Sequence, residues 1–375
     1  MIYYLRYALR SKWVFLKPPK KDILIYDGLP KIDYFLDKKN ITYFNKRNSV
    51  NIFILFKTLI QDGFKNIKEN YIKNYFNIVS PKIVMTSIDN NLSFFKLKYI
   101  YNEPKYICIQ GSLRDKFFLN KCREYYKKNN KKLFADYFFV YGKNDLIKLK
   151  KYISTKFIIN GSFRNNLFSK KIKKTKIKKM IFISQASDKF FFDQEKTLVY
   201  KLIRISKKIN LKFLYLLKNE KNNPFLNHIK NYFQKLNVEG QFKYFIRDTK
   251  KLSNKSISYQ KKKDQYNFLN KPAIFLSLSS TFAFEAISRK KKVIFFPINN
   301  FPTEKYIFSE KYKKNGPFWL SNRSSAKIEA KIKKVISMTD IELSKSIKKN
   351  ISDIIVFSPK NKNLETTLKK LQVYS

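Results

Sequence analysis

The chain has 375 residues and carries 80 Lys and Arg against 27 Asp and Glu, a formal net charge of +53. Hydrophobic residues make up 44% and aromatic residues 17% of it, which excludes an intrinsically disordered chain. Two cysteines exclude a disulfide framework, and a single histidine excludes metal sites and mechanisms that need two or three. At this length we expect two domains.

The positive charge comes from lysine. The chain has 70 Lys and 10 Arg, with many Asn, Ile, Phe and Tyr residues and only 7 Gly, a bias that an A+T-rich genome would produce. Proteins that read nucleic acid rely on Arg, whose planar guanidinium pairs with phosphates and guanine edges. Nucleic-acid binding is therefore disfavoured, although the field attracts anionic lipids and phosphorylated substrates.

Residues 1–21 form a basic and aromatic leader. They lack the small-residue cleavage site of a secretory signal. Two interpretations stay open: a helix that lies on an anionic membrane, and a helix packed on the following domain. No apolar run reaches the roughly 20 residues that span a bilayer. We expect a cytoplasmic protein, with peripheral contact to the inner face of the cell membrane as an open alternative.

From Asp22 onward, short apolar runs alternate with longer helical patterns. The predicted strands are 23–26, 41–44, 82–87, 105–110, 137–141 and 156–159. The predicted helices are 30–39, 51–61, 65–79, 91–100 and 144–152. This alternation is typical of an α/β fold with a doubly wound parallel sheet. We therefore assign residues 22–168 to a first Rossmann-like domain.

The pattern restarts after a lysine-rich stretch, and we interpret 169–179 as an interdomain linker; a solvated helix end is the alternative. The next predicted strands are 180–184, 212–217, 242–246, 272–277 and 292–296, with helices at 195–209, 227–236 and 281–288. We assign 180–323 to a second Rossmann-like domain and 324–375 to C-terminal helices. The expected architecture is two Rossmann-like domains that face a cleft.

The strongest local signal is the segment 274–287, where a buried strand runs into Ser279, Ser280 and Thr281 and a helix begins. Ligands of open α/β sheets bind beyond the carboxyl ends of the strands. A hydroxyl residue here caps the helix, whose free N–H groups and dipole form an anion site. Glu285, one turn further, is placed to accept hydrogen bonds from a ribose. An ordinary cap with a solvent-facing Glu is the alternative.

The run SSTFAFEAISRKKKVIFF, residues 279–296, resembles the donor-site segment of GT-B-type glycosyltransferases, and looks most similar to bacterial surface-carbohydrate (O-antigen) biosynthesis proteins of that fold. Similar segments occur in bacterial sialyltransferases, glycerophosphotransferases of teichoic acid synthesis and non-hydrolysing UDP-N-acetylglucosamine 2-epimerases. The resemblance implies that Ser279, Ser280 and Thr281 hold phosphate and that Glu285 contacts ribose. The family often has Gly after the hydroxyl residues, whereas Phe282 stands here and leaves a phosphate less room.

Polar residues follow two strands of the first domain: Asp89, Asn90, Gln110, Gly111, Arg114 and Asp115. In the family, a strand that ends in Gln, followed by a Gly turn and an Arg, faces the cleft. Related transferases often carry a His in this turn. Its absence here leaves Asp89 and Asp115 as the carboxylates that take a proton from an acceptor hydroxyl, with Asx turns or helix caps as the alternative. Arg114 pairs with a phosphate or forms a surface salt bridge.

The segment 160–166 is similar to the family's Gly-Ser-x-Arg-Asn-Asn segment at the domain junction, where Gly161 permits a sharp turn and Arg164 reaches a phosphate. Ser184 and Gln185 end the first strand of the second domain, which in this fold lines the donor cleft. The segment 316–319 also looks like a family segment, in which we interpret the Trp as a core anchor. The resemblance covers residues 22–319.

The sequence lacks a Walker loop, a GxGxxG motif and an Asp-x-Asp motif at a strand end, so ATP, dinucleotide and metal-bound donor sites lack their usual residues. The resemblance implies no metal and no cofactor beyond a UDP- or CMP-linked sugar. We predict a glycosyltransferase-like enzyme of surface polysaccharide synthesis that transfers a sugar or related group to a glycan or lipid-linked acceptor. The alternatives are a UDP-sugar 2-epimerase-like enzyme and a non-catalytic polybasic protein that binds membranes or RNA.

Overall fold

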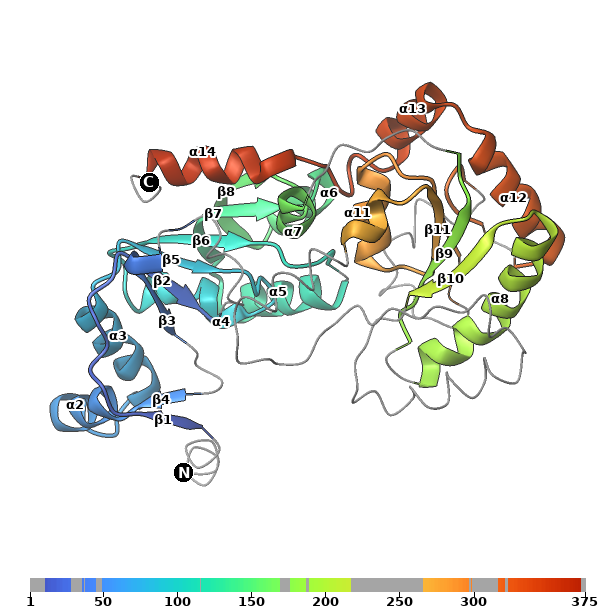
Figure 1. The fold of residues 1–375 in the computed structure, drawn as a ribbon. Helices are drawn as coiled ribbons and strands as arrows, with labels where there is room; N and C mark the ends of the chain where they lie inside the picture. The colour runs from blue at the N-terminus through green and yellow to red at the C-terminus, as the bar shows by residue number, and fades with distance from the viewer. Residues whose placement is uncertain are drawn as a thin grey trace. The chain divides into compact units, whose positions relative to one another are not determined.

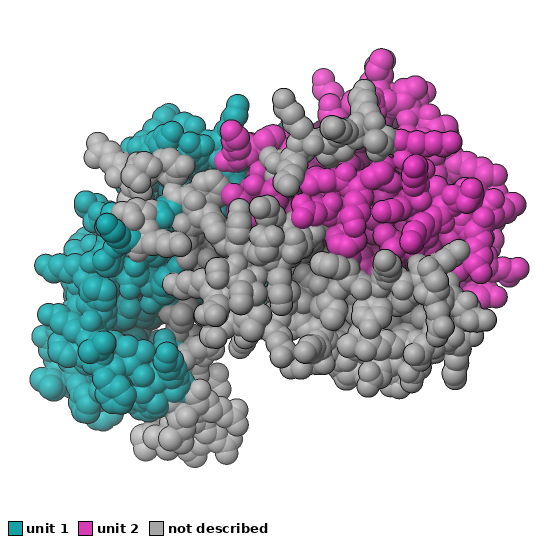
Figure 2. Space-filling model, in the orientation of Figure 1, with its two compact units in different colours: residues 1–112, 118–163, 361–375 teal, residues 113–117, 164–360 magenta. Residues whose placement is uncertain are grey.

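The computed structural model consists of two compact units (Figures 1 and 2). Unit 1 comprises residues 1–112, 118–163 and 361–375, and unit 2 comprises residues 113–117 and 164–360. The structure describes residues 11–27, 36, 38–44, 49–114, 116–168, 176–186, 189–216, 266–296, 298, 316–320 and 323–371. Each unit is built on a parallel sheet, which confirms the predicted α/β class with two Rossmann-like domains.

The main sheet of unit 1 has six parallel strands in the order β3-β2-β5-β6-β7-β8. They are β2 (Ile23–Tyr26), β3 (Ile41–Phe44), β5 (Ile83–Thr86), β6 (Lys105–Ile109), β7 (Leu133–Val140) and β8 (Ile153–Ile159). The last two begin earlier than the sequence predicted. The chain first adds β3 on one side of β2 and later β5 on the other, so the strand order reverses between β2 and β5.

The described helices of unit 1 are α2 (Ile52–Asp62), α3 (Ile67–Val79), α4 (Leu92–Phe95), α5 (Lys116–Asn129), α6 (Lys143–Leu149) and α14 (Lys362–Lys370), with short 3-10 turns η2 (Lys38–Asn40) and η3 (Leu97–Tyr99). A further 3-10 turn, η6 (Pro359–Asn361), lies where the chain returns from unit 2 to unit 1. The sequence did not predict α5. A separate two-stranded parallel sheet joins β1 (Lys12–Val14) to β4 (Ser49–Asn51). This part of the leader is therefore a strand, whereas we expected a helix. Most of the predicted helix 30–39 lies outside the described residues.

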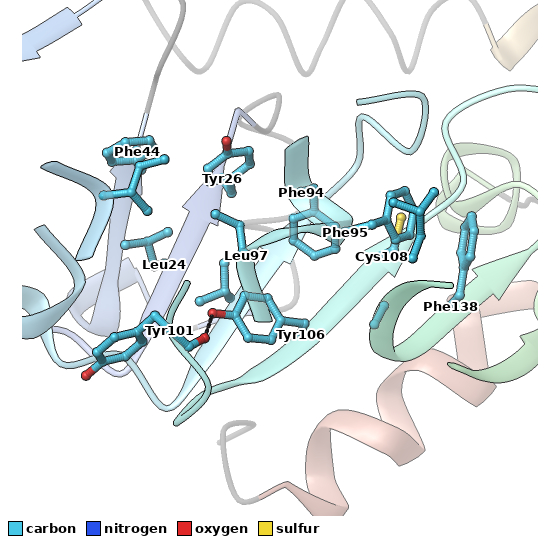
Figure 3. Close-up of a cluster of buried hydrophobic side chains, with 14 of the residues drawn as sticks. Leu24, Tyr26, Phe44, Phe94, Phe95, Leu97, Tyr101, Tyr106, Cys108 and Phe138 are labelled. Carbon is cyan, nitrogen blue, oxygen red and sulfur yellow. Dashed lines mark hydrogen bonds between the residues drawn. The ribbon is translucent and has the colours of Figure 1, made fainter. Parts of the chain in front are cut away.

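The core of unit 1 has two layers, one on each face of the main sheet. Leu24 and Tyr26 of β2 belong to the larger cluster, and Ile23 and Ile25 to the other, as the period of two in a strand requires. Figure 3 shows the larger cluster, in which aromatic rings of the strands meet α4 and η3. Tyr106 donates a hydrogen bond to the Tyr101 carbonyl, and burial raises the pKa of its hydroxyl. Apolar side chains thus cover both faces of the central strands.

The described sheet of unit 2 has four parallel strands in the order β10-β9-β11-β12. They are β9 (Lys179–Ile183), β10 (Lys212–Leu216), β11 (Ala273–Ser277) and β12 (Val293–Phe295). The described helices are α7 (Phe163–Leu167), where the chain enters the unit, α8 (Lys189–Lys208), α11 (Thr281–Ser288), α12 (Ser325–Ser337) and α13 (Asp340–Asn350), with η4 (Phe268–Asn270). Among the described strands, the order reverses between β9 and β11.

The C-terminal helices do not form one group. We expected residues 324–375 to belong together, but α12 and α13 lie in unit 2 whereas α14 lies in unit 1. Leu364 and Leu368 of α14 pack in the same cluster as Ile23 and Ile25. The predicted elements at 227–236 and 242–246 and most of the linker 169–179 lie outside the described residues.

Candidate functional site

The candidate site lies at the carboxyl edge of the unit 2 sheet, where the order of the described strands reverses between β9 and β11. Ile183 and Ser277 are paired in register, so both strands end at the same level. The segments that follow them carry Gln185 and Ser279. Ligands of doubly wound sheets bind at such a reversal, because the two loops diverge there.

The side chain of Gln185 joins these two loops. Its Oε1 accepts hydrogen bonds from the Ser279 backbone N–H at 2.7 Å and from the Ser279 hydroxyl at 3.2 Å. Ser277, the last residue of β11, also connects the two loops. Its hydroxyl donates a hydrogen bond to the Ile183 carbonyl at 3.0 Å and accepts one from the Ser280 N–H at 3.3 Å. The hydroxyl-rich loop is thus fixed against β9 before any ligand binds.

Helix α11 begins directly after this loop. Ser280 is the N-cap residue with an extended backbone, and its side chain makes no capping hydrogen bond to the helix. The first turn contains no acidic residue. The positive end of the helix dipole therefore lies next to Ser279, Ser280 and Thr281, which favours an anion such as a phosphate.

A buried carboxylate that the sequence reasoning missed holds the loop after β9. Glu195 of α8 is 1% exposed, and its Oε2 accepts from the Ser184 hydroxyl at 2.7 Å and from the Tyr215 hydroxyl at 2.6 Å. Its Oε1 accepts from the Gln185 N–H. Glu195 lies one helical turn before the buried Leu198 and Val199. An acidic residue within an apolar stripe is a signal that could have identified it.

Glu285 is buried on α11 and accepts a hydrogen bond from the Tyr266 hydroxyl at 2.8 Å. The alternative of a solvent-facing Glu is therefore wrong. The Tyr266 ring stacks on Phe168, with ring centroids 5.2 Å apart, and meets Phe282 edge-on. Glu285 is thus held in a fixed position, and its contact with a ribose stays a prediction.

The C-terminal end of α11 is braced by the segment 160–166. Asn165 donates to the Glu285 carbonyl at 3.2 Å and to the Ser288 hydroxyl at 3.0 Å. It also accepts from Nε of the buried Arg289 at 2.6 Å. The Arg289 guanidinium lies over the rings of Tyr266 and Phe357, 5.4 and 5.2 Å from their centroids.

This brace has electrostatic consequences. Burial lowers the pKa of Arg289, and burial together with the Arg289 charge lowers the pKa of Lys291 to about 8.

The segment 160–166 also contains Gly161, where we predicted a sharp turn. Its φ of 73° confirms that turn. Arg164 is half-buried, and its contact with a phosphate stays a prediction.

In unit 1, side chains join the loops that follow neighbouring strands. Asp27, with a φ of 45°, ends β2 and accepts from Asn91 Nδ2 at 2.9 Å, across the reversal between β2 and β5. Asp89 is fully buried, and its Oδ1 accepts from the Gly111 N–H at 2.8 Å. The sequence analysis did not single out Asp27. Asp89 as a catalytic base stays a prediction.

The side chain of Gln110 makes hydrogen bonds to neighbouring residues of unit 1. Its Oε1 accepts from the Tyr141 N–H at 2.7 Å, and its Nε2 donates to the Ser112 carbonyl at 2.9 Å and to the Asp145 carboxylate. The Tyr141 hydroxyl donates to the Gly111 carbonyl at 3.1 Å. These bonds fix the turn after β6, in which the sequence singled out Gln110, Gly111 and Arg114. Arg114 is half-buried and Asn90 is exposed, and the roles assigned to both stay predictions; Asp115 lies outside the described residues.

Cys108 and Cys122 are both buried in unit 1. Burial, together with the Asp89 charge, raises the pKa of Cys122 to about 12, so this thiol stays protonated at neutral pH. No group of three or more His, Cys, Asp or Glu among the described residues could hold a metal ion. Trp319 is buried and its backbone bridges Phe295 of β12, as the interpretation of a core anchor predicted.

Solved structures of the same fold cover nearly the whole chain. A UDP-GlcNAc 2-epimerase from Methanocaldococcus jannaschii is 12% identical, with a TM-score of 0.53, over 94% of this chain and 99% of that one. MnaA from S. aureus, solved with UDP, is 12% identical, with a TM-score of 0.51, over 94% and 97%. A sucrose-phosphate synthase from Thermosynechococcus elongatus is 10% identical, with a TM-score of 0.50, over 93% and 88%. At such identities the similarity shows the fold alone.

Sequence comparison identifies a family. Residues 107–372, more than two thirds of the chain, match the model of a family described as "putative O-antigen biosynthesis protein". The match covers the hydroxyl loop, α11, the brace at Asn165 and the Glu195 network. No curated protein matches the chain.

Proposed function

Because the chain belongs to this O-antigen biosynthesis family, we propose that it is a glycosyltransferase of surface polysaccharide synthesis. It transfers a sugar or a related group from a UDP- or CMP-linked donor to a glycan or lipid-linked acceptor. The observation that carries the proposal is the edge of unit 2, where Gln185 and Ser277 fix a hydroxyl loop at the N-terminus of α11. The donor phosphates bind there.

The carboxyl edge of the unit 2 sheet can stabilise the nucleotide that leaves during transfer. Transfer breaks the bond between the anomeric carbon of the donor sugar and the phosphate oxygen, and forms a bond from that carbon to the acceptor oxygen. The electron pair of the broken bond stays on the phosphate, whose charge the α11 dipole and the hydroxyls of Ser279, Ser280 and Thr281 stabilise. The S. aureus relative of this fold contains UDP, which supports a nucleotide as the ligand.

The acceptor hydroxyl loses its proton in this step, so a base is needed. We assign that role to a carboxylate, either Asp89 of unit 1 or Asp115. The carboxylate of Asp89 is already bonded to the Gly111 N–H, so replacing it also loosens that turn. The proposal includes no metal ion. It places the protein at the inner face of the cell membrane, with lipid-linked acceptors.

An assay of nucleotide release tests the proposal. The protein is incubated with UDP- and CMP-sugars, with and without a lipid extract that supplies acceptors. We expect release of one nucleotide that requires the extract. Release of no nucleotide from any donor, with or without the extract, would contradict the proposal.

A second candidate is a UDP-sugar 2-epimerase-like activity. It is favoured by the two structures above, the epimerase and MnaA, which this chain covers almost completely. An epimerase converts the UDP-sugar in the absence of any acceptor and leaves the sugar bound to UDP. Conversion without an acceptor would replace the transferase proposal by this one.

A further inference from the structure

Helix α2 of unit 1 presents its apolar side to solvent. Its sequence, IFILFKTLIQD, buries only Ile54 and Thr58, whereas Phe56 is 60% and Ile60 is 83% exposed. Phe53, Phe56 and Ile60 follow the spacing of one helical stripe. The stripe thus points away from the unit, opposite to the usual arrangement of a surface helix.

Polar contacts occupy the inner side of the same helix. The Thr58 hydroxyl donates to the Ile54 carbonyl at 2.8 Å and accepts from Asn74 Nδ2 of α3 at 3.1 Å. Asn74 also donates to the Asp62 carboxylate at 2.9 Å. These bonds fix the rotation of α2 about its axis. The outward stripe is therefore a feature of the packed unit.

Neighbouring segments extend the apolar surface. Phe15 and Leu16 follow β1 and Phe64 follows α2, and all three side chains are more than two thirds exposed. Figure 1 shows α2, β1 and β4 lying together in unit 1, next to α3. An open groove of about 500 Å³ runs between Phe15 and the side chains of Phe53, Phe56 and Ile60. We call the surface formed by Phe15, Leu16, Phe53, Phe56, Ile60 and Phe64 the α2 face.

Two lysines lie at the α2 face, and others are close to it in the sequence. Lys57 lines the groove, and the Lys17 ammonium lies 5.8 Å from the centre of the Phe53 ring. The segments 11–21 and 52–68 contain seven lysines and one acidic residue, Asp62, which is bonded to Asn74. Aliphatic lysine stems can lie along an apolar surface while the ammonium groups remain in water.

We propose that the α2 face binds the surface of a membrane that contains anionic lipid. Apolar side chains that enter the acyl boundary, within a rim of lysines that reach the headgroups, are the combination by which amphipathic surfaces bind such membranes. A second copy of the chain fits this face poorly, because it too carries a charge of +53. The inference rests on unit 1 and does not depend on the proposed activity.

Vesicle flotation of the full chain tests the proposal. The vesicles contain phosphatidylcholine alone or mixed with phosphatidylglycerol, and the salt concentration is raised until purely ionic attraction is screened. We expect the protein to stay bound to the mixed vesicles, and the double variant Phe56→Ser/Ile60→Ser to bind at least tenfold more weakly. The control Ile341→Ser, at an exposed position of α13, binds like the unchanged protein.

Tryptophan fluorescence provides a second measurement that requires no change in the face. Trp13 lies on β1, two residues before Phe15, and is partly exposed, whereas Trp319 is buried in unit 2. We expect brominated lipids in the mixed vesicles to quench the fluorescence of the bound protein. The quenching is lost in Trp13→Phe.

Two results would overturn the proposal. The first is equal binding of the protein and the double variant at every salt concentration, which would leave only unspecific attraction by the net charge. The second is a double variant that binds vesicles normally but no longer forms oligomers or no longer binds RNA. If no nucleotide binds while vesicle binding still depends on Phe56 and Ile60, the proposed function fails and this inference stands.

Discussion

Glu195 shows how a single buried carboxylate organises the candidate site. It accepts hydrogen bonds from Ser184, Gln185 and Tyr215, and so fixes the loop after β9 from which Gln185 reaches Ser279. Sequence reasoning found Ser184 and Gln185 from their place after a strand. It could not find their partner, because Glu195 and Tyr215 reach the loop only once the helix and the sheet have packed.

We expect Glu195→Ala to lower the free energy of unfolding by about 3 kcal/mol, because it removes the shared acceptor of the buried Ser184 and Tyr215 hydroxyls and of the Gln185 N–H. Chemical denaturation measures the effect. The matched control is Glu365→Ala, which removes a partly exposed i,i+4 ion pair with Lys369 and costs less than about 0.5 kcal/mol. Equal effects of the two substitutions would mean that the buried network contributes no more than a surface ion pair.

At the scale of elements, the strands that run into loops were the most predictable part. Continuous apolar runs such as Ile83–Thr86 and Ala273–Ser277 predicted the strands. The hydroxyl residues that follow the second run predicted the start of α11. The helix α5 was not predicted. It has many charged residues and buries only Phe118 and Cys122, so its apolar periodicity is weak. The hydrogen bonds from Asn165 to α11 could not be predicted from the sequence either, because the two segments are far apart in the chain.

The turn between α11 and β12 has a pH dependence that follows from its burial. The pKa of Lys291 in the folded protein is about 8, below its ordinary value of 10.5. Between these values the unfolded chain binds a proton that the folded chain does not, so this lysine's contribution to stability rises with pH across that window. Below it, the charged and partly buried lysine destabilises the folded state.

We therefore expect Lys291→Met to stabilise the protein below about pH 8, and this gain to shrink by about 2 kcal/mol as the pH rises to 10.5. Because the side chain is partly exposed, solvent screening keeps this change below the value that the pKa difference alone would give. Denaturation of both proteins across this range measures the difference, in which the titration of other groups cancels. A gain that does not change with pH would contradict the assigned pKa.

At the scale of the whole molecule, the chain returns to unit 1 after completing unit 2. The composition and the alternation of elements predicted two parallel-sheet domains, but not that α14 would leave its neighbours α12 and α13. All three helices have amphipathic patterns, and the pattern does not indicate which sheet each one covers. In the described structure, Leu364 and Leu368 supply apolar surface to a core whose other members lie more than 200 residues earlier.

Because α14 packs in the core of unit 1, this helix contributes to the stability of that unit. We expect Leu368→Ala to lower the free energy of unfolding by about 2–4 kcal/mol, because it creates a cavity in the cluster that contains Ile23 and Ile25. Denaturation followed by near-ultraviolet circular dichroism measures the loss. Ile341→Ala, at an exposed site, is the control, and a loss no larger than that of the control would show that α14 does not support the core.

The central claim is that the edge of unit 2 between β9 and β11 binds a nucleotide. Calorimetric titration with UDP, CMP, CDP and GDP at two salt concentrations, for the protein and for Glu285→Gln, tests it most directly. We predict that one nucleotide binds at both salt concentrations and binds at least tenfold more weakly to the variant. Weak and equal binding of all four nucleotides that disappears with salt would contradict the claim and leave only the attraction of a highly basic protein for anions.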